Sequence, residues 1–212
     1  TNLYSPTEDK KPFAALEILR RKHELLFCPC CGEDGIPGTL DHYLPKKSYP
    51  ELSIVMANLV PMCSDCQLEK GVEFISAENQ KIFLHPYFDL IDRPLIELAI
   101  CLPYSSPTDF LIAPAKGLPA PTEALVVRHM AGIGFIKRYK EYCQGKYMHV
   151  LKLIAAERLE AEPLNSDALI RRFLKQEECK AINSWGSIFY RSILANPELL
   201  TFFDKAKLPE NL

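Results

Sequence analysis

Two cysteine pairs constrain this chain more than any other feature of its sequence. Cys28 and Cys31 are separated by two residues, and Cys63 and Cys66 have the same spacing. Cysteines at this spacing can direct two thiolates at one ion at about 2.3 Å, and two such pairs complete the tetrahedron that zinc prefers. The sequence therefore predicts a structural zinc site that ties together two segments distant in the chain.

Two alternatives to this ligand set are open. Cys30 lies inside the first pair and could replace either neighbour, although the two-residue spacing favours Cys28 and Cys31. Disulfides are the second alternative, but eight cysteines in 212 residues are too sparse for a disulfide scaffold, and the chain does not start like a signal peptide. The remaining thiols stand alone and are expected to be small buried hydrophobes: Cys101, Cys143 and Cys179.

Composition describes a water-soluble chain. The 25 basic and 27 acidic residues nearly balance, and no apolar run is long enough to span a bilayer. We therefore expect a cytoplasmic protein with no membrane partner. A hydrophobic content of 48% over 212 residues can supply one good core or two small ones.

Hydrophobic spacing predicts a helix over residues 12–27, a hairpin from strands 39–44 and 55–61, and a helix over 64–72. Beyond residue 81 the sequence pattern changes to short apolar stretches separated by prolines. This pattern predicts a small antiparallel sheet from segments 82–84, 95–102, 110–113 and 125–129. From residue 135 the pattern is helical, with segments 135–161, 167–183 behind a Ser166 cap, 185–195, and a short helix that starts at Asn196-Pro197.

An acid and a histidine, Asp41-His42, lie between the cysteine pairs and are followed by Tyr43-Leu44-Pro45. The run Asn58-Leu59-Val60-Pro61 precedes the second pair, and Lys70-Gly71 follows it. Together with the thiol spacing, these motifs closely resemble the HNH (ββα-metal) endonuclease family with its zinc-binding frame. The resemblance covers residues 28–71, about a fifth of the chain.

The resemblance implies a division of labour at a phosphodiester bond. His42 would be the general base, because an imidazole can accept a proton from water at neutral pH. Asp41 would bind a catalytic divalent ion, Mg²⁺ or Mn²⁺, since both prefer hard oxygen ligands. Asn58 would fix the orientation of His42 through a backbone or ring contact.

One position departs from the family pattern. The family has a histidine or asparagine directly after the last zinc cysteine, and this chain has Gln67, which keeps an amide oxygen but is one methylene longer. Gln67 is expected to help hold the catalytic ion, with Asp65 or His85 as possible further ligands.

Several side chains are candidate contacts to a substrate. Lys70, Lys46 and Lys47 are candidate phosphate contacts, with a solvated surface lysine as the alternative for Lys70. His85 stands in the segment His85-Pro-Tyr-Phe-Asp89 and is expected either to line the cleft or to bond a backbone carbonyl within packed aromatic rings.

The expected fold class is α+β, with a nuclease domain over residues 1–90 and a sheet with a helical subdomain over 91–212. Residues 1–81 carry nine basic and twelve acidic side chains, whereas autonomous DNA binders usually carry a basic face. The sequence thus favours a regulated or targeted DNA nuclease. By analogy, such a nuclease would be an anti-phage effector that works beside an ATPase partner. The sequence is compatible with an oligomer. The alternatives are a zinc-stapled nucleic-acid or protein binding module with a degenerate site, and a nuclease that cleaves RNA, including tRNA.

Overall fold

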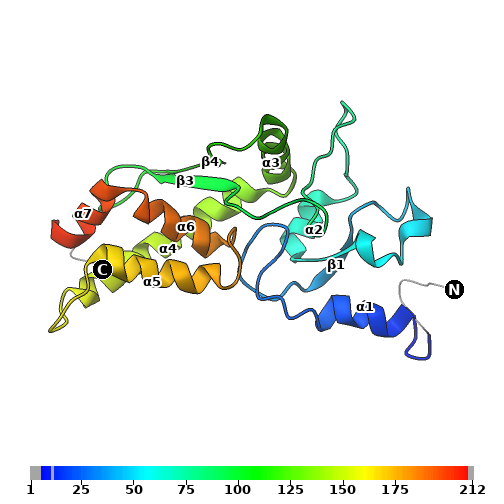
Figure 1. Cartoon of the computed structure of the whole chain (residues 1–212), viewed down its shortest axis with the longest axis horizontal. Coiled ribbons are helices and arrows are strands. Elements are labelled where there is room, and N and C mark those ends of the chain that lie inside the picture. The colour runs from blue at the N-terminus through cyan, green and yellow to red at the C-terminus, as the bar shows by residue number, and fades with distance from the viewer. Residues whose placement is uncertain (1–5, 11, 210–212) are drawn as a thin grey trace. The chain divides into compact units, whose positions relative to one another are not determined.

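The computed structural model describes residues 6–10 and 12–209, and the chain divides into two compact units (Figure 1). The described residues up to Ile91, together with Pro119–Phe135, form the first unit. Asp92–Leu118 and the described residues from Ile136 onward form the second. Helices are mixed with two small antiparallel sheets, which agrees with the α+β class expected from the sequence.

The first unit holds a strand pair between helices (Figure 1). Its elements are α1 (Pro12–Arg21), β1 (Thr39–His42), the 3-10 turns η1 (Pro50–Leu52) and η2 (Met56–Asn58), β2 (Leu59–Met62), α2 (Ser64–Lys70) and α3 (Ala120–Gly132). The two strands are antiparallel, with Asp41 opposite Val60 and His42 opposite Leu59. This order matches the predicted sequence of helix, hairpin and helix, although each element is shorter than expected.

A small apolar cluster joins α1 to the strand pair. Leu16 from α1 packs with Leu40 and Leu59 from the two strands, and all three are buried. The helix ends at Arg21 rather than at residue 27, and Glu24 then takes a positive φ of 56°, which an α-helix does not allow. The chain thereby turns from α1 toward the first cysteine pair.

The prediction of a strand over residues 125–129 is wrong, because this segment lies inside α3. Pro119 is the N-cap of the helix and Pro121 lies in its first turn, where a missing N–H costs nothing. Val126, His129 and Met130 are buried at the i, i+3, i+4 spacing of one helix face. The apolar character of this segment suggested a strand, but its burial follows the helical period. Residues 82–84 likewise form no named strand.

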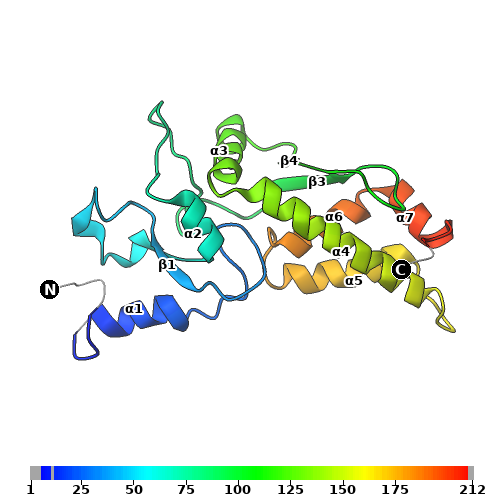
Figure 2. The ribbon, with the colours of Figure 1, turned by 180° about the vertical axis from the view of Figure 1, so that it is seen from behind.

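The second unit combines the other strand pair with four helices. Its elements are β3 (Ile96–Ile100), β4 (Phe110–Pro114), α4 (Phe135–Glu157), α5 (Ser166–Glu178), α6 (Trp185–Leu194) and α7 (Pro197–Lys205). β3 and β4 pair antiparallel, with Leu98 opposite Ile112. Figure 2 shows α4, the longest of these helices, from the other side.

Side-chain caps begin three of these helices. The side chain of Asn196 accepts a hydrogen bond from the Leu199 N–H, with Pro197 at the first position, so the predicted start of α7 is confirmed. α5 starts one residue earlier than expected, because Asn165 rather than Ser166 provides the cap. The side chain of Ser184 caps α6.

The core of the second unit is aromatic. Tyr139 and Tyr147 from α4 are fully buried beside Trp185, Phe189 and Phe203. The Tyr139 hydroxyl donates to the carbonyl of Trp185, and the Tyr147 hydroxyl donates to the carbonyl of Tyr104, so both buried phenols have partners.

The first unit is discontinuous in sequence. The chain leaves it after Ile91, and Pro119–Phe135 returns to it, whereas the sequence had suggested one continuous region up to residue 90. Within the described residues, no helix combines the length and the apolar character that crossing a bilayer requires.

Candidate functional site

The four cysteines of the two pairs converge in the first unit. The Sγ atoms of Cys28, Cys31, Cys63 and Cys66 all lie within 4.8 Å of one another. The Sγ atoms of Cys31 and Cys63 are 3.9 Å apart, close to the edge of about 3.8 Å of a tetrahedron with sulfur at 2.3 Å from its centre. The donor set and its spacing fit a structural metal such as zinc, as the sequence predicted.

Local backbone geometry presents these sulfurs. Gly32 has a φ of 80° and its N–H donates to the Cys28 carbonyl at 2.7 Å, which closes the first knuckle. In the second pair, Cys63 is the N-cap of α2, and the Cys66 N–H approaches its Sγ at 3.4 Å. The Cys63 N–H also donates to Cys28 Sγ at 3.3 Å, so backbone donors from the second pair approach sulfurs of both pairs.

The disulfide alternative does not agree with the structure. All eight cysteines of the chain lie within the described residues and carry free thiols, and 3.9 Å is far beyond the sulfur–sulfur bond of about 2.05 Å. Cys30 is not a member of the four-sulfur cluster. Its carbonyl accepts a hydrogen bond from His129 Nε2 at 2.7 Å, so α3 is joined to the first knuckle.

His42 is the last residue of β1 and is partly buried. Its Nε2 lies 3.1 Å from the carbonyl oxygen of Ser53, which only a protonated nitrogen can approach as a donor. In the neutral ring the lone pair is then on Nδ1. Burial lowers the pKa of His42 below 6.5, and the charge of Lys46 lowers it further, against the raising effect of the Ser53 bond. Burial therefore favours the neutral form of the ring.

Asn58 holds the loop on which His42 depends. Its Oδ1 accepts the Leu44 N–H at 2.7 Å, and its Nδ2 donates to the carbonyls of Leu44 at 3.0 Å and Leu52 at 3.1 Å. Ser53, whose carbonyl accepts from His42, directly follows Leu52. Asn58 thus fixes both ends of the loop between Leu44 and Leu52 through backbone groups. Because Ser53 follows this loop, Asn58 also restrains the carbonyl that accepts the hydrogen bond from His42.

Asp41 lies in β1 beside His42 and is buried against a cation. Its Oδ2 is 3.0 Å from Lys70 Nζ, and the two side chains are 9% and 1% exposed. Lys70 Nζ also donates to the His42 carbonyl at 3.1 Å and lies 5.5 Å from the ring centroid of Phe83. Asp41 Oδ2 is sealed from solvent and accepts no aligned hydrogen bond, so its charge is balanced mainly by the lysine.

The burial of Lys70 differs from the phosphate contact that the sequence suggested. The ammonium is buried, pairs with the Asp41 carboxylate and donates a hydrogen bond to the His42 carbonyl. Gln67 lies three residues before Lys70 in α2 and is partly buried. Residues three apart share one face of a helix, so Gln67 is on the α2 face that approaches β1.

Lys46 and Lys47 are exposed on the loop that follows Pro45. Asp65 is exposed in the first turn of α2. Beyond the four cysteines, the described residues contain no further group of three or more His, Cys, Asp or Glu side chains arranged for one ion.

His85 is 5% exposed, and both ring nitrogens have backbone partners. Nε2 lies 3.1 Å from the Ala57 carbonyl, and Nδ1 accepts the Tyr87 N–H at 3.2 Å. Burial lowers its pKa below the usual value. The ring nevertheless lines a cavity of about 530 Å³ that Asn58 also lines. The bond to the Ala57 carbonyl agrees with one of the two expectations for His85, and a role in a substrate cleft stays a prediction.

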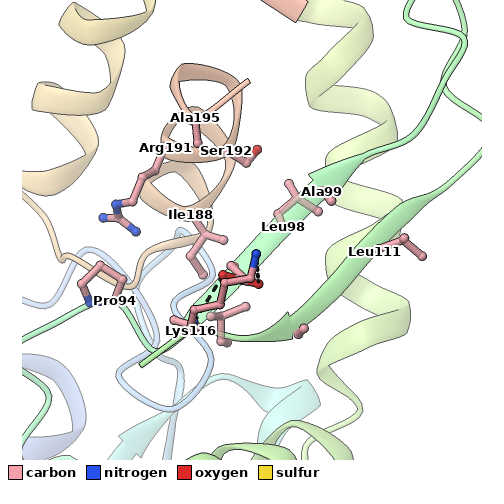
Figure 3. A pocket seen from close by; sticks show the side chains of 13 residues that line it. Pro94, Leu98, Ala99, Leu111, Lys116, Ile188, Arg191, Ser192 and Ala195 are labelled. Atoms are coloured by element: carbon pink, nitrogen blue, oxygen red, sulfur yellow. Dashed lines mark hydrogen bonds and ion pairs between the residues drawn. The ribbon is translucent and has the colours of Figure 1, made fainter. Parts of the chain in front are cut away.

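The second unit has a pocket of its own, of about 470 Å³, between the β3–β4 sheet and α6 (Figure 3). Leu98 and Leu111 line it from the sheet, and Ile188 and Arg191 line it from the helix. Arg191 is paired with Glu178 at 2.8 Å. None of the residues singled out from the sequence lies in this pocket.

Two contributors to the site carry no signal in the sequence. Ser53 acts through its carbonyl, which every residue has, and His129 lies far along the chain in a helix. Lys70 was recognised, but its burial depends on how α2 packs on β1. Only the Lys-Gly ending of the motif marked its position.

The first unit is therefore an α+β unit with four cysteines that could hold a structural metal, an acid and a histidine at the end of its first strand, and a buried lysine from α2 against that acid. Over 63 residues, 29% of the chain, the sequence is 46% identical to Protein ea31 of Escherichia phage lambda, and the match covers 21% of that protein. Over 63 residues it is 33% identical to the Septu protein PtuB of Bacillus thuringiensis, 24% of that protein. The chain thus matches about a fifth to a quarter of the length of these relatives. No family model and no solved structure matches it.

Proposed function

We propose that this chain is a metal-dependent endonuclease that hydrolyses phosphodiester bonds of DNA, and that it acts as a regulated or targeted effector of phage defence. The observation that carries the proposal is the setting of His42. Its Nε2 is committed to the Ser53 carbonyl, and a carboxylate stands next to it in the same strand. The partial similarity to a phage protein and to a Septu protein supports the phage-related role.

His42 acts as the general base through Nδ1. A neutral imidazole with its Nε2–H fixed on a carbonyl can take a proton from water at Nδ1, and the Ser53 carbonyl then stabilises the imidazolium. Asn58 is a positioning residue, since it holds the loop that carries this carbonyl.

Asp41 and Gln67 are the residues that would hold a catalytic Mg²⁺ or Mn²⁺. A carboxylate with an amide oxygen is a donor set that fits a hard cation, whose coordination substrate oxygens and waters usually complete. When bound, the ion would stabilise the negative charge that develops on the phosphate oxygens. Lys70 holds the same carboxylate in place and balances its negative charge. The exposed Lys46 and Lys47 contact the phosphate backbone.

Plasmid nicking tests this function. Zinc-loaded protein should convert supercoiled DNA to open circles in Mg²⁺ or Mn²⁺, and His42→Ala should lower the rate by at least about 100-fold. The zinc content of that variant, measured by metal analysis, should be unchanged, because His42 is not a ligand of the cluster. Cutting retained in His42→Ala would refute the assignment of the base.

A second candidate is a zinc-stapled binding module, and the observation that favours it is the replacement of the usual histidine or asparagine by Gln67. A folded, zinc-loaded sample that binds DNA but cleaves it in no divalent ion would support the module. Digestion of plasmid, single-stranded DNA and total RNA side by side separates the DNA nuclease from one that acts on RNA or tRNA. Co-purification with an ATPase partner is expected if the chain works as part of a complex.

A further inference from the structure

A cavity of about 530 Å³ in the first unit is built partly on the loop that follows the proposed catalytic histidine, His42. Tyr43, which directly follows His42, forms part of its wall, and so does Asn58, which ties the histidine loop. The cavity is therefore built on the same loop that positions the imidazole. Its other aromatic walls are Phe74, His85 and Phe88.

Tilted aromatic rings contact one another along one wall of this cavity. The ring centroids of Tyr43 and His85 are 4.3 Å apart, and those of His85 and Phe88 are 4.5 Å apart. His85 is 5% exposed whereas Phe88 is 70% exposed. Phe88 therefore packs against a buried ring and leaves most of its own surface open to solvent.

The polar groups of the walls are already engaged within the protein. The side-chain amide of Asn58 bonds backbone groups of Leu44 and Leu52. Both ring nitrogens of His85 have backbone partners, and Lys81 Nζ contacts both carboxylate oxygens of Asp89. The cavity thus offers apolar and aromatic surface with few groups that could read the edge of a base.

Positive charge lies on the same loop. Lys46 and Lys47 are exposed three and four residues after Tyr43, and the charge of Lys46 is close enough to affect the neighbouring imidazole. An aromatic platform beside cationic side chains is the combination by which proteins bind single-stranded nucleic acids. A base in an intact duplex has both faces covered and would first have to leave the stack.

We propose that this cavity receives an unpaired nucleobase next to the scissile phosphate and holds it by stacking on Phe88 without reading its identity. The proposal rests on the proposed nuclease function and narrows the substrate to single-stranded or locally unpaired DNA. Lys46 and Lys47 hold the flanking phosphates, and the engaged polar groups of the wall leave stacking as the main source of affinity.

Binding of single-stranded oligonucleotides that carry one 2-aminopurine tests this directly. In the His42→Ala background, which is not expected to cut, the fluorescence of the base should change and saturate with protein. Phe88→Ala should weaken this binding roughly 5- to 150-fold, the range that one base–aromatic stack provides. Phe88→Trp should restore it, and Leu90→Ala is the matched control, because Leu90 is 77% exposed and does not line the cavity.

With His42 intact, a DNA duplex carrying a one-base bulge should be cut faster than the fully paired duplex, and Phe88→Ala should remove that preference. Equal binding of the oligonucleotide by Phe88→Ala and Leu90→Ala would overturn the proposal of a base pocket. That result is expected if the cavity receives an apolar side chain of a protein partner instead. Base binding that depends on Phe88 in a protein that never cuts DNA would overturn the nuclease function alone. The two failures are therefore distinguishable.

Discussion

The ion pair between Lys70 and Asp41 is the most demanding feature of the first unit, because two charges are buried for one contact. Lys70→Met keeps most of the side-chain stem but removes the ammonium. The variant leaves a carboxylate that is 9% exposed without its counter-charge. It also takes the hydrogen-bond donor away from the His42 carbonyl.

The separation of 3.0 Å sets the size of the effect. Two unit charges at this distance attract by about 5 kcal/mol at an effective dielectric constant of about 20. Removing one partner of a buried pair usually costs about 3–5 kcal/mol, and we expect Lys70→Met to lower the free energy of unfolding of the first unit by that amount. Arg21→Met, which breaks an exposed helical pair at 3.9 Å, should change it by less than about 0.5 kcal/mol.

Urea unfolding of the zinc-loaded protein, followed at the transition of the first unit, measures these differences. A double-mutant cycle with Asp41→Asn isolates the pair, since the double variant buries no charge at this position. The cost of the double variant should be at least about 1 kcal/mol less than the sum of the two single costs. Additive costs, or a loss below about 1 kcal/mol in Lys70→Met, would refute the reasoning.

Three further predictions concern the metal site and the packing of the first unit. Cys66→Ser should lose the bound zinc and the thermal transition of the first unit, whereas the exposed Cys179→Ser should keep both, as metal analysis and calorimetry would record. Gly132→Ala should lower the free energy of unfolding by about 1–3 kcal/mol in urea, because a Cβ there would lie 2.6 Å from Phe83 Cε1. Gly145→Ala is the control and should not destabilise the protein, because a Cβ at this helical position would meet open space. Burial lowers the pKa of His85 below 6.5; the Ala57 bond and the charge of Asp89 raise this pKa, and the charge of Lys81 lowers it. The unfolded chain therefore binds the proton more tightly than the folded chain does. Stability should therefore fall as pH drops below about 6.5, and the thermal midpoint of His85→Gln should fall less over the same range; equal slopes would contradict this.

Elements whose causes are local were predictable. The start of α7 follows from Asn196 and Pro197, which satisfy the first turn with adjacent residues. The metal cluster follows from two short spacings, because the ligand chemistry of thiolates limits what four such cysteines can do. The segment 125–129 of α3 was predicted wrongly because a short apolar run fits either the strand or the helix period, and only burial decides between them.

What the sequence by itself determined is the chemistry available to this protein: four cysteines whose spacing suits one metal, an acid beside a histidine, and an asparagine expected to orient that histidine. Tertiary structure decided how that chemistry is used. Lys70 became the buried partner of Asp41, and His129 became the link from α3 to the first knuckle. The physical reason is range. A cap or a ligand pair depends on neighbours a few residues away, whereas burial, charge pairing and cavity walls depend on segments that meet only when the chain has folded.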